Sequence, residues 1–346
     1  MTAAAAAKGK WGRRLLQALV MLVALGGLVA ITLWATAALY FDVRIAWLRG
    51  PLAGAYLGVI VTLWVVIKPR WRAALLTSTA FILVLGWWLL LKPSNDRNWI
   101  PDLAVLPYAE FSGDRVTIHN IRNCDYRSET DFDVRHYDRT FNLSDLKTVD
   151  LYMVYWGSPL MAHTMVSFGF GDDQYVCFSI ETRKEQGEGY SAVKGLFRQF
   201  ELTYVIADER DVVRLRTNYR QGEDAYLYRL KVTPEAARQF FLEYIHRANS
   251  LRIQPEWYNA VTDNCTTGIR TQRAAADRAP WNWRILVNGL GNELLYTRGR
   301  IATNLPLPQV KELGHINARA RAADQNENFS KLIREGLPDP NSAPAK

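Results

Sequence analysis

Cysteine and histidine are scarce in this chain of 346 residues, with three and five copies. No CxxC pair occurs and the histidines are scattered, so the spacing of a zinc site is missing. We therefore expect no metal and no cofactor. Two of the cysteines, Cys124 and Cys177, could pair in an oxidising compartment and leave Cys265 free, or none of the three could pair.

Acidic residues are almost missing from the first quarter of the chain. Residues 1–92 hold ten Lys or Arg and one acid, Asp42, a balance of +9. Residues 93–346 hold 32 basic and 33 acidic residues, a balance of −1. The net charge of +8 therefore belongs to the N-terminal quarter, and no basic groove for a nucleic acid is expected in the larger part.

Charge is also missing from three long apolar runs, at about 15–41, 51–67 and 73–91. A bilayer needs about 20 apolar residues for one helical crossing. We interpret residues 1–92 as a membrane anchor with three transmembrane helices. A cleaved signal peptide is the alternative for the first run, but that run is longer than a signal peptide's apolar region.

The basic residues orient this anchor. Four of them precede the first span and three lie between the second and third, within residues 68–72. The positive-inside rule then places the N-terminus and that turn in the cytoplasm. With three crossings, everything after Leu91 lies outside a bacterial inner membrane, in the periplasm.

The outer part is predicted to be an α+β domain. We expect a polar linker over 93–113, a domain of antiparallel strands packed with helices over 114–313, and a surface helix with a flexible tail over 314–346. The expected strands are 149–156, a strand that holds His163, 175–182, 200–207, 212–216 and 225–232, and Thr233-Pro234 opens a helix.

Two features provide the parts of a thiol nucleophile. Cys265 follows Asp263 and Asn264, which are good N-cap residues, so its thiol is expected on a first helical turn, where the helix dipole favours a thiolate. His163 lies on a predicted strand and could accept the thiol proton. The alternative is that both residues are only packed in the core.

A third group could orient the histidine. Gly171 lies in a predicted hairpin turn after the His163 strand, and the next strand alternates, with Ser179 and Glu181 on one face. If that face coincides with the face of His163, either residue could hold the imidazole, as the third member of a triad does.

Two charged runs are open to interpretation. Residues 122–139 are dense in both signs of charge, which is typical of an ion-paired surface and also of a polar pocket wall. Residues 208–211 contain three acids that could bind a hard cation, although the spacing is not that of a calcium loop.

Several of these segments together resemble the periplasmic domain of the Lnb (lipoprotein N-acyltransferase B) family. They are the run 119–131, Tyr155-Trp156-Gly157-Ser158 with Ala162-His163-Thr164, the segments 179–183 and 208–211, and Asp263-Asn264-Cys265. The resemblance covers roughly residues 110–275. It implies a permuted papain-like fold, similar to that of lecithin retinol acyltransferase and permuted NlpC-type enzymes, in which the histidine strand precedes the cysteine helix.

The resemblance also implies a reaction. Cys265 attacks an acyl ester, His163 accepts the thiol proton, and an acyl-thioester forms. Of Ser179 and Glu181, we expect Glu181 to orient the histidine, because its charge can stabilise an imidazolium. The matching motifs indicate Arg127, Arg183 and Asn264 as substrate-binding residues. We therefore predict a periplasm-facing acyltransferase or hydrolase whose partners are the membrane and a phospholipid or lipoprotein substrate. The alternatives are an envelope peptidase or amidase, and a non-catalytic binding module.

Overall fold

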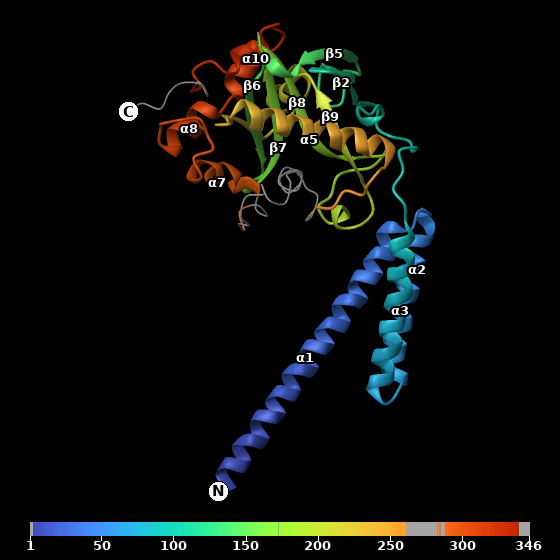
Figure 1. Ribbon diagram of the computed structural model, residues 1–346. Coiled ribbons are helices and arrows are strands. Elements are labelled where there is room, and N and C mark those ends of the chain that lie inside the picture. The colour runs from blue at the N-terminus through green and yellow to red at the C-terminus, as the bar shows by residue number, and fades with distance from the viewer. Residues whose placement is uncertain (1–2, 172, 261–281, 283, 285–287, 339–346) are drawn as a thin grey trace. The chain divides into compact units, whose positions relative to one another are not determined.

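The computed structural model describes residues 3–338, except 172, 261–281, 283 and 285–287. The chain divides into two compact units (Figure 1). One consists of Met1–Lys92 with Phe197–Gln199, and the other of Pro93–Leu196 with Phe200–Lys346.

The first unit contains three apolar helices, over the three runs that lack charge. They are α1 (Ala3–Asp42), α2 (Ala46–Val66) and α3 (Arg70–Leu90), and each is long and apolar enough to cross a membrane. The Trp88 indole donates a hydrogen bond of 2.7 Å to the Asp42 carboxylate, which joins the end of α3 to the end of α1. Helix α2 begins at Ala46, before the predicted start at Pro51, so Pro51 lies inside the helix.

The second unit contains a mostly antiparallel sheet of eight strands. Its order is β1-β2-β9-β8-β7-β6-β10, with β5 paired to β2, and β2 and β9 form a parallel pair. The strands are β1 (Tyr108–Ser112), β2 (Arg115–Arg122), β5 (His136–Asn142), β6 (Leu146–Trp156), β7 (Ser158–Phe170), β8 (Gln174–Arg183), β9 (Glu201–Ala207) and β10 (Glu223–Arg229). A separate small hairpin pairs β3 (Asp125–Tyr126) with β4 (Phe132–Asp133). This mixed architecture confirms the predicted α+β class.

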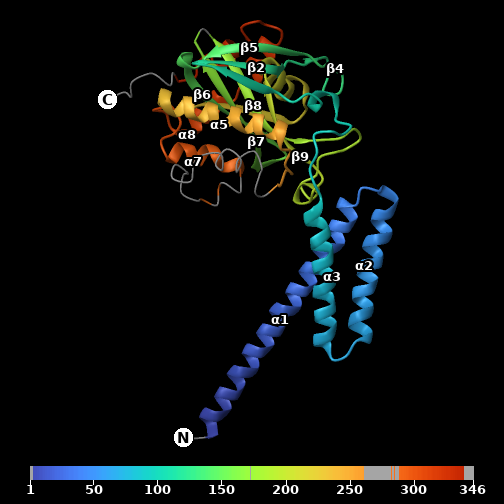
Figure 2. The ribbon, with the colours of Figure 1, turned by 45° about the vertical axis from the view of Figure 1, so that its right-hand side comes forward.

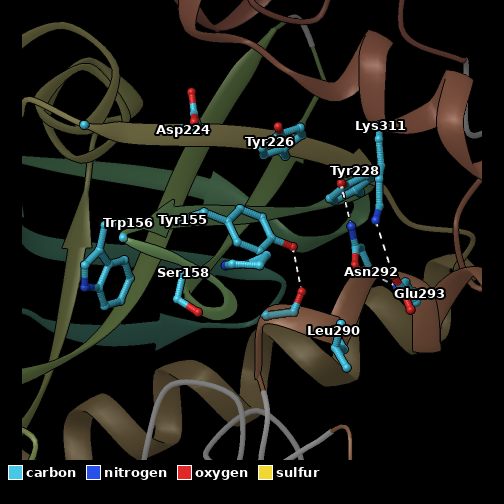
Figure 3. Close-up of a pocket in the computed structure, with 14 residues that line it drawn as sticks. Tyr155, Trp156, Ser158, Asp224, Tyr226, Tyr228, Leu290, Asn292, Glu293 and Lys311 are labelled. Carbon is cyan, nitrogen blue, oxygen red and sulfur yellow. Dashed lines mark hydrogen bonds and ion pairs between the residues drawn. The ribbon is translucent and has the colours of Figure 1, made fainter.

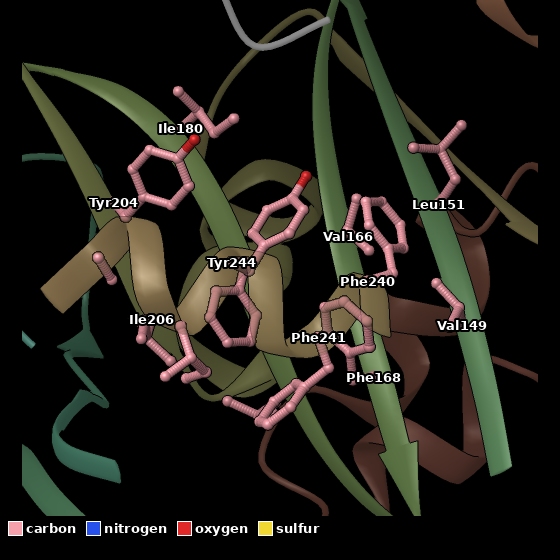
Figure 4. Close-up of a cluster of buried hydrophobic side chains, with 14 of the residues drawn as sticks. Val149, Leu151, Val166, Phe168, Ile180, Tyr204, Ile206, Phe240, Phe241 and Tyr244 are labelled. Carbon is pink, nitrogen blue, oxygen red and sulfur yellow. The ribbon is translucent and has the colours of Figure 1, made fainter. Parts of the chain in front are cut away.

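One face of the sheet is covered by α5 (Pro234–Ile253), which crosses the strands (Figures 1 and 2). The helix begins where the sequence predicted, because the Thr233 side chain caps it by accepting a hydrogen bond from the Ala236 amide. Phe168 of β7 contacts the rings of Phe240 and Phe241 at centroid distances of 5.7 and 5.2 Å (Figure 4). This aromatic cluster forms the larger of the two hydrophobic cores beside the sheet.

Short helices cover the opposite face. They are α4 (Glu209–Arg214), the π-helix η4 (Leu215–Tyr219), α9 (Asn317–Ala323) and α10 (Phe329–Leu332). Phe329 and Ile333 are fully buried there, in a core shared with Tyr152 and Cys177 of the sheet. Residues 314–346 were predicted to form a surface helix and a flexible tail. The structure instead places α9 and α10 against the sheet, and residues 339–346 lie outside the described residues.

The remaining helices of the described residues are short. They are η1 (Pro101–Leu103), η2 (Leu143–Asp145), η3 (Lys194–Leu196), η7 (Asn288–Leu290), α7 (Gly291–Thr297) and α8 (Leu307–Gly314). The prediction of a strand over 212–216 was wrong. Those residues belong to α4 and η4 because the Asp208 carboxylate caps this segment, accepting a hydrogen bond from the Arg210 amide.

Candidate functional site

His163 lies on β7, in the interior of the sheet. It is opposite Val154 of β6, and two residues later Met165 is opposite Ser179 of β8. Because side chains alternate between the faces of a strand, this register puts His163, Ser179 and Glu181 on one face. His163 is 8% exposed, so its ring is held largely away from water.

The three predicted side chains are in direct contact. Nε2 of His163 lies 2.7 Å from the Ser179 hydroxyl and 3.1 Å from Oε1 of Glu181. The Ser179 hydroxyl donates a hydrogen bond of 2.7 Å to the same carboxylate oxygen. Because the Ser179 hydroxyl donates its hydrogen to Glu181, its oxygen accepts a hydrogen bond from the imidazole ring. Nε2 of the neutral imidazole therefore carries the proton, and Nδ1 is the basic nitrogen. The predicted proximity of this group is confirmed.

A buried arginine lies behind the carboxylate. Nη2 of Arg216 lies 3.3 Å from Oε1 of Glu181, and its Nη1 lies 3.2 Å from Glu223. The Arg216 side chain is 10% exposed, and it comes from the π-helix η4. π-Helical turns are rare in proteins. Those that occur are often found at functional sites. Sequence reasoning missed Arg216 because it assigned this segment to a strand.

The surroundings of Glu181 keep it ionised. Burial would raise its pKa, but the positive charge that His163 carries when protonated, the Arg216 guanidinium and the Ser179 hydroxyl outweigh burial and hold the pKa well below its usual range. An ionised carboxylate at this position orients the imidazole and stabilises an imidazolium. The geometry therefore provides an oriented acid-base histidine.

The nucleophile predicted from sequence is not among the residues that the structure describes. Cys265 and Asn264 both lie within 261–281. The two described cysteines, Cys124 and Cys177, are free and buried. Burial raises the pKa of the Cys124 thiol to about 12 and that of Cys177 well above its usual value, so neither provides a thiolate at neutral pH.

The two predicted substrate-binding arginines lie elsewhere in the domain. Arg183 is 2% exposed and donates to the carbonyls of Leu103 and Ala104, while its guanidinium stacks on Trp99. Arg127 lies in the small β3–β4 hairpin, half exposed, and pairs with Asp131 at 2.6 Å. The guanidinium groups of both arginines are engaged by the chain itself.

The acids of residues 208–211 have internal partners. Asp211 is fully buried and accepts two hydrogen bonds from Arg122, at 2.8 and 2.9 Å. Glu209 is fully buried and accepts from both terminal nitrogens of Arg334, at 2.7 and 2.8 Å. Within the described part of the chain, no cluster of three His, Cys, Asp or Glu side chains could hold a metal ion. The cation interpretation of this run is therefore replaced by a structural one.

Arg334 also binds a second buried acid. Its Nε donates a hydrogen bond of 2.8 Å to Asp150 of β6, and its guanidinium lies 3.5 Å from the centroid of the Tyr175 ring. The pair of acids and Arg334 thus joins β6, α4 and the segment after α10. This network fixes the helices that cover the histidine face of the sheet.

Residues 133–289 match the family model described as the Lnb N-terminal periplasmic domain. The matched segment contains His163, Ser179, Glu181 and Arg216, and it confirms the resemblance found in the sequence. No curated protein and no solved structure matches the chain.

Proposed function

We propose, from the match of residues 133–289 to the Lnb N-terminal periplasmic domain, that the chain is a cysteine acyltransferase or hydrolase acting on a lipid ester or lipoprotein. The family match and the three apolar helices make it a membrane-anchored periplasmic protein. The chemistry is proposed from the histidine site.

One observation carries the proposal. The Ser179 hydroxyl and the Glu181 carboxylate hold Nε2 of the buried His163 at 2.7 and 3.1 Å. A histidine that is fixed through one nitrogen by a carboxylate presents the other nitrogen as a general base, as in the triads of acyl-transfer enzymes. A histidine that served only packing would not need an ionised carboxylate and a buried arginine behind it.

The proposed reaction has two halves. In the first, His163 takes the proton of the Cys265 thiol at Nδ1, the sulfur adds to the ester carbonyl, and the C–O bond breaks as the imidazolium returns the proton to the leaving alcohol. In the second, His163 takes a proton from an amine or from water, which attacks the acyl-thioester and releases the thiol. Glu181 stabilises the imidazolium in both halves.

The remaining site residues follow from the same proposal. Asn264, next to the nucleophile, is proposed to contact the substrate. Arg127 and Arg183 are left out, because their guanidinium groups pair with Asp131 and with backbone carbonyls. A permuted papain-like arrangement, with the histidine strand before the cysteine helix, is consistent with the order of His163 and Cys265.

The anchor suits a substrate with acyl chains. The basic residues before α1 and between α2 and α3 favour an N-terminus in the cytoplasm and three crossings of the inner membrane, with the α+β domain in the periplasm. A domain tethered to its own spans stays close to lipid. Phospholipids and lipoproteins are therefore the proposed substrates.

Mass spectrometry of the intact protein tests the proposal. The full chain is incubated with phosphatidylethanolamine vesicles, as the wild type and as C265A and H163A. The wild type should gain the mass of one acyl group, and both variants should lack it. C124A, which removes a thiol with a high pKa, and H246A, at an exposed position on α5, are the matched controls and should keep the adduct.

Two results would contradict the proposal. An adduct that survives in C265A would place the acyl group on another residue. If the wild type forms no adduct and an alkylating probe labels its Cys265 no faster than its Cys177, the domain is better explained as a binding module.

A further inference from the structure

A cavity of about 380 Å³ lies at the end of the β6–β7 hairpin (Figure 3). Its walls come from β6, β10, η7, α7 and α8, and the hairpin tip at Trp156–Pro159 borders it. This volume lies in the range of small-molecule sites.

The cavity is separate from the histidine site, because the two lie on opposite faces of the sheet. Val154 is opposite His163 and packs in the core below α4 and α9, whereas its neighbour Tyr155 lines the cavity and packs in the core below α5. Tyr226 and Tyr228 of β10 line the cavity from the same face as Tyr155. A ligand here would not occupy the proposed acyl-transfer site.

The walls are held by their own hydrogen bonds. The Tyr155 hydroxyl donates to the Gly289 carbonyl at 2.8 Å, and the Asn292 amide donates to the Tyr228 hydroxyl at 2.9 Å (Figure 3). A Cβ at Gly289 would come within 2.3 Å of the Pro159 carbonyl, so only glycine allows this close approach. The site is pre-formed, which lowers the ordering cost of binding.

The wall chemistry excludes two ligand classes. Asp224, Glu293 and Lys311 line the cavity, and Lys311 pairs with Glu293 at 3.3 Å. An acyl chain would desolvate these charges without replacing their hydrogen bonds, which is unfavourable. An anion would meet two carboxylates and one lysine that is already paired.

The remaining groups fit a neutral ligand rich in hydroxyls. Carboxylate and tyrosine oxygens accept hydrogen bonds, the Lys311 ammonium and the Ser158 hydroxyl donate them, and a sugar hydroxyl does both. Trp156, at the rim, is 37% exposed and offers a flat apolar surface for the C–H face of a sugar ring. We infer that this cavity is a binding site for a carbohydrate unit, separate from the histidine site.

Saturation-transfer NMR tests the inference with the full chain in a detergent that has no sugar headgroup. The probes are N-acetylglucosamine, glucosamine, glucose 6-phosphate and octanoate. The neutral sugar should bind with a dissociation constant of roughly millimolar order, more tightly than the other three. W156A and E293Q should each weaken it by about tenfold or more. Y190A, at an aromatic residue that does not line the cavity, and H163A should leave it unchanged.

The competing outcomes are distinct. If glucosamine binds more tightly than the neutral sugar, the ligand is an organic cation and the inference of a neutral carbohydrate is wrong. If octanoate or glucose 6-phosphate binds more tightly, the charged residues of the cavity do not exclude acyl chains or anions, and the inference is wrong. Absence of binding by all four probes overturns the inference. If H163A loses as much sugar binding as W156A and E293Q do, the sugar binds in the histidine site and the inference of a separate site is wrong.

Discussion

Nη2 of Arg216 lies 3.3 Å from the same oxygen of Glu181 that faces the imidazole of His163. The arginine therefore acts on the histidine through the carboxylate, and it is a positioning residue. It also connects the site to Glu223 at the start of β10, so that β7, β8, β10 and the π-helix share one network.

The first prediction concerns the charge of Glu181. E181Q keeps the size of the side chain but removes the negative charge that stabilises the imidazolium, so acyl-adduct formation should slow by about 10²-fold or more. The rate is followed by mass spectrometry over time. E312Q, at an exposed position on α8, is the matched control, and an unchanged rate in E181Q would remove Glu181 from the mechanism.

The second prediction concerns Arg216. R216Q leaves Glu181 and Glu223, which are 28% and 11% exposed, without their shared cation, and it should destabilise the domain by about 2–4 kcal/mol. R216K keeps the charge and should recover part of this loss. Thermal unfolding in detergent measures the stability. The ¹⁵N chemical shifts of labelled His163, measured against pH, follow the titration of its ring. If R216Q leaves the His163 titration unchanged, Arg216 is only structural.

The third prediction concerns the buried network at Arg334. R334A leaves the fully buried Glu209 without its cation and the fully buried Asp150 with Arg229 alone, and a loss of about 3–5 kcal/mol is expected. R238A removes an arginine that is 42% exposed from a surface pair and should change stability by less than about 1 kcal/mol. Comparable unfolding temperatures for the two variants would contradict the assigned role of the network.

The fourth prediction is a pH dependence from Glu209. Burial raises its pKa, but the charge and hydrogen bonds of Arg334 outweigh burial and lower the pKa below the usual 4.5. Because the pKa of Glu209 is lower in the folded protein than in the unfolded chain, its ionised form stabilises the fold above about pH 4.5. This stabilisation is lost as the pH falls through the pKa of Glu209 in the folded protein. Unfolding temperatures measured from pH 7 to pH 3 should fall, and E209Q should show a smaller fall from a lower starting point.

The fifth prediction concerns Gly289. G289A would bring a Cβ to 2.3 Å from the Pro159 carbonyl, so the hairpin tip or η7 must shift, at a cost of about 1–3 kcal/mol. G189A is the control, because a Cβ there meets nothing within 4 Å. Equal unfolding temperatures for the two variants would show that the hairpin tip yields freely.

Local pattern was enough for much of the fold. The uncharged runs predicted the three apolar helices, and Thr233-Pro234 predicted the start of α5. Strict alternation in β8 predicted that Ser179 and Glu181 share one face. The register of the β7–β8 hairpin in the structure made this the face of His163.

The partners of the charged residues were decided by tertiary structure. A run such as 208–211 has the same composition on a surface as in a core, and only packing brought Arg122 to Asp211 and Arg334 to Glu209. Arg216 could not be found for the same reason, since its partner Glu181 lies 35 residues away. Periodicity and capping act over a few residues and are written in the sequence, whereas desolvated ion pairs depend on which distant segments the fold brings together.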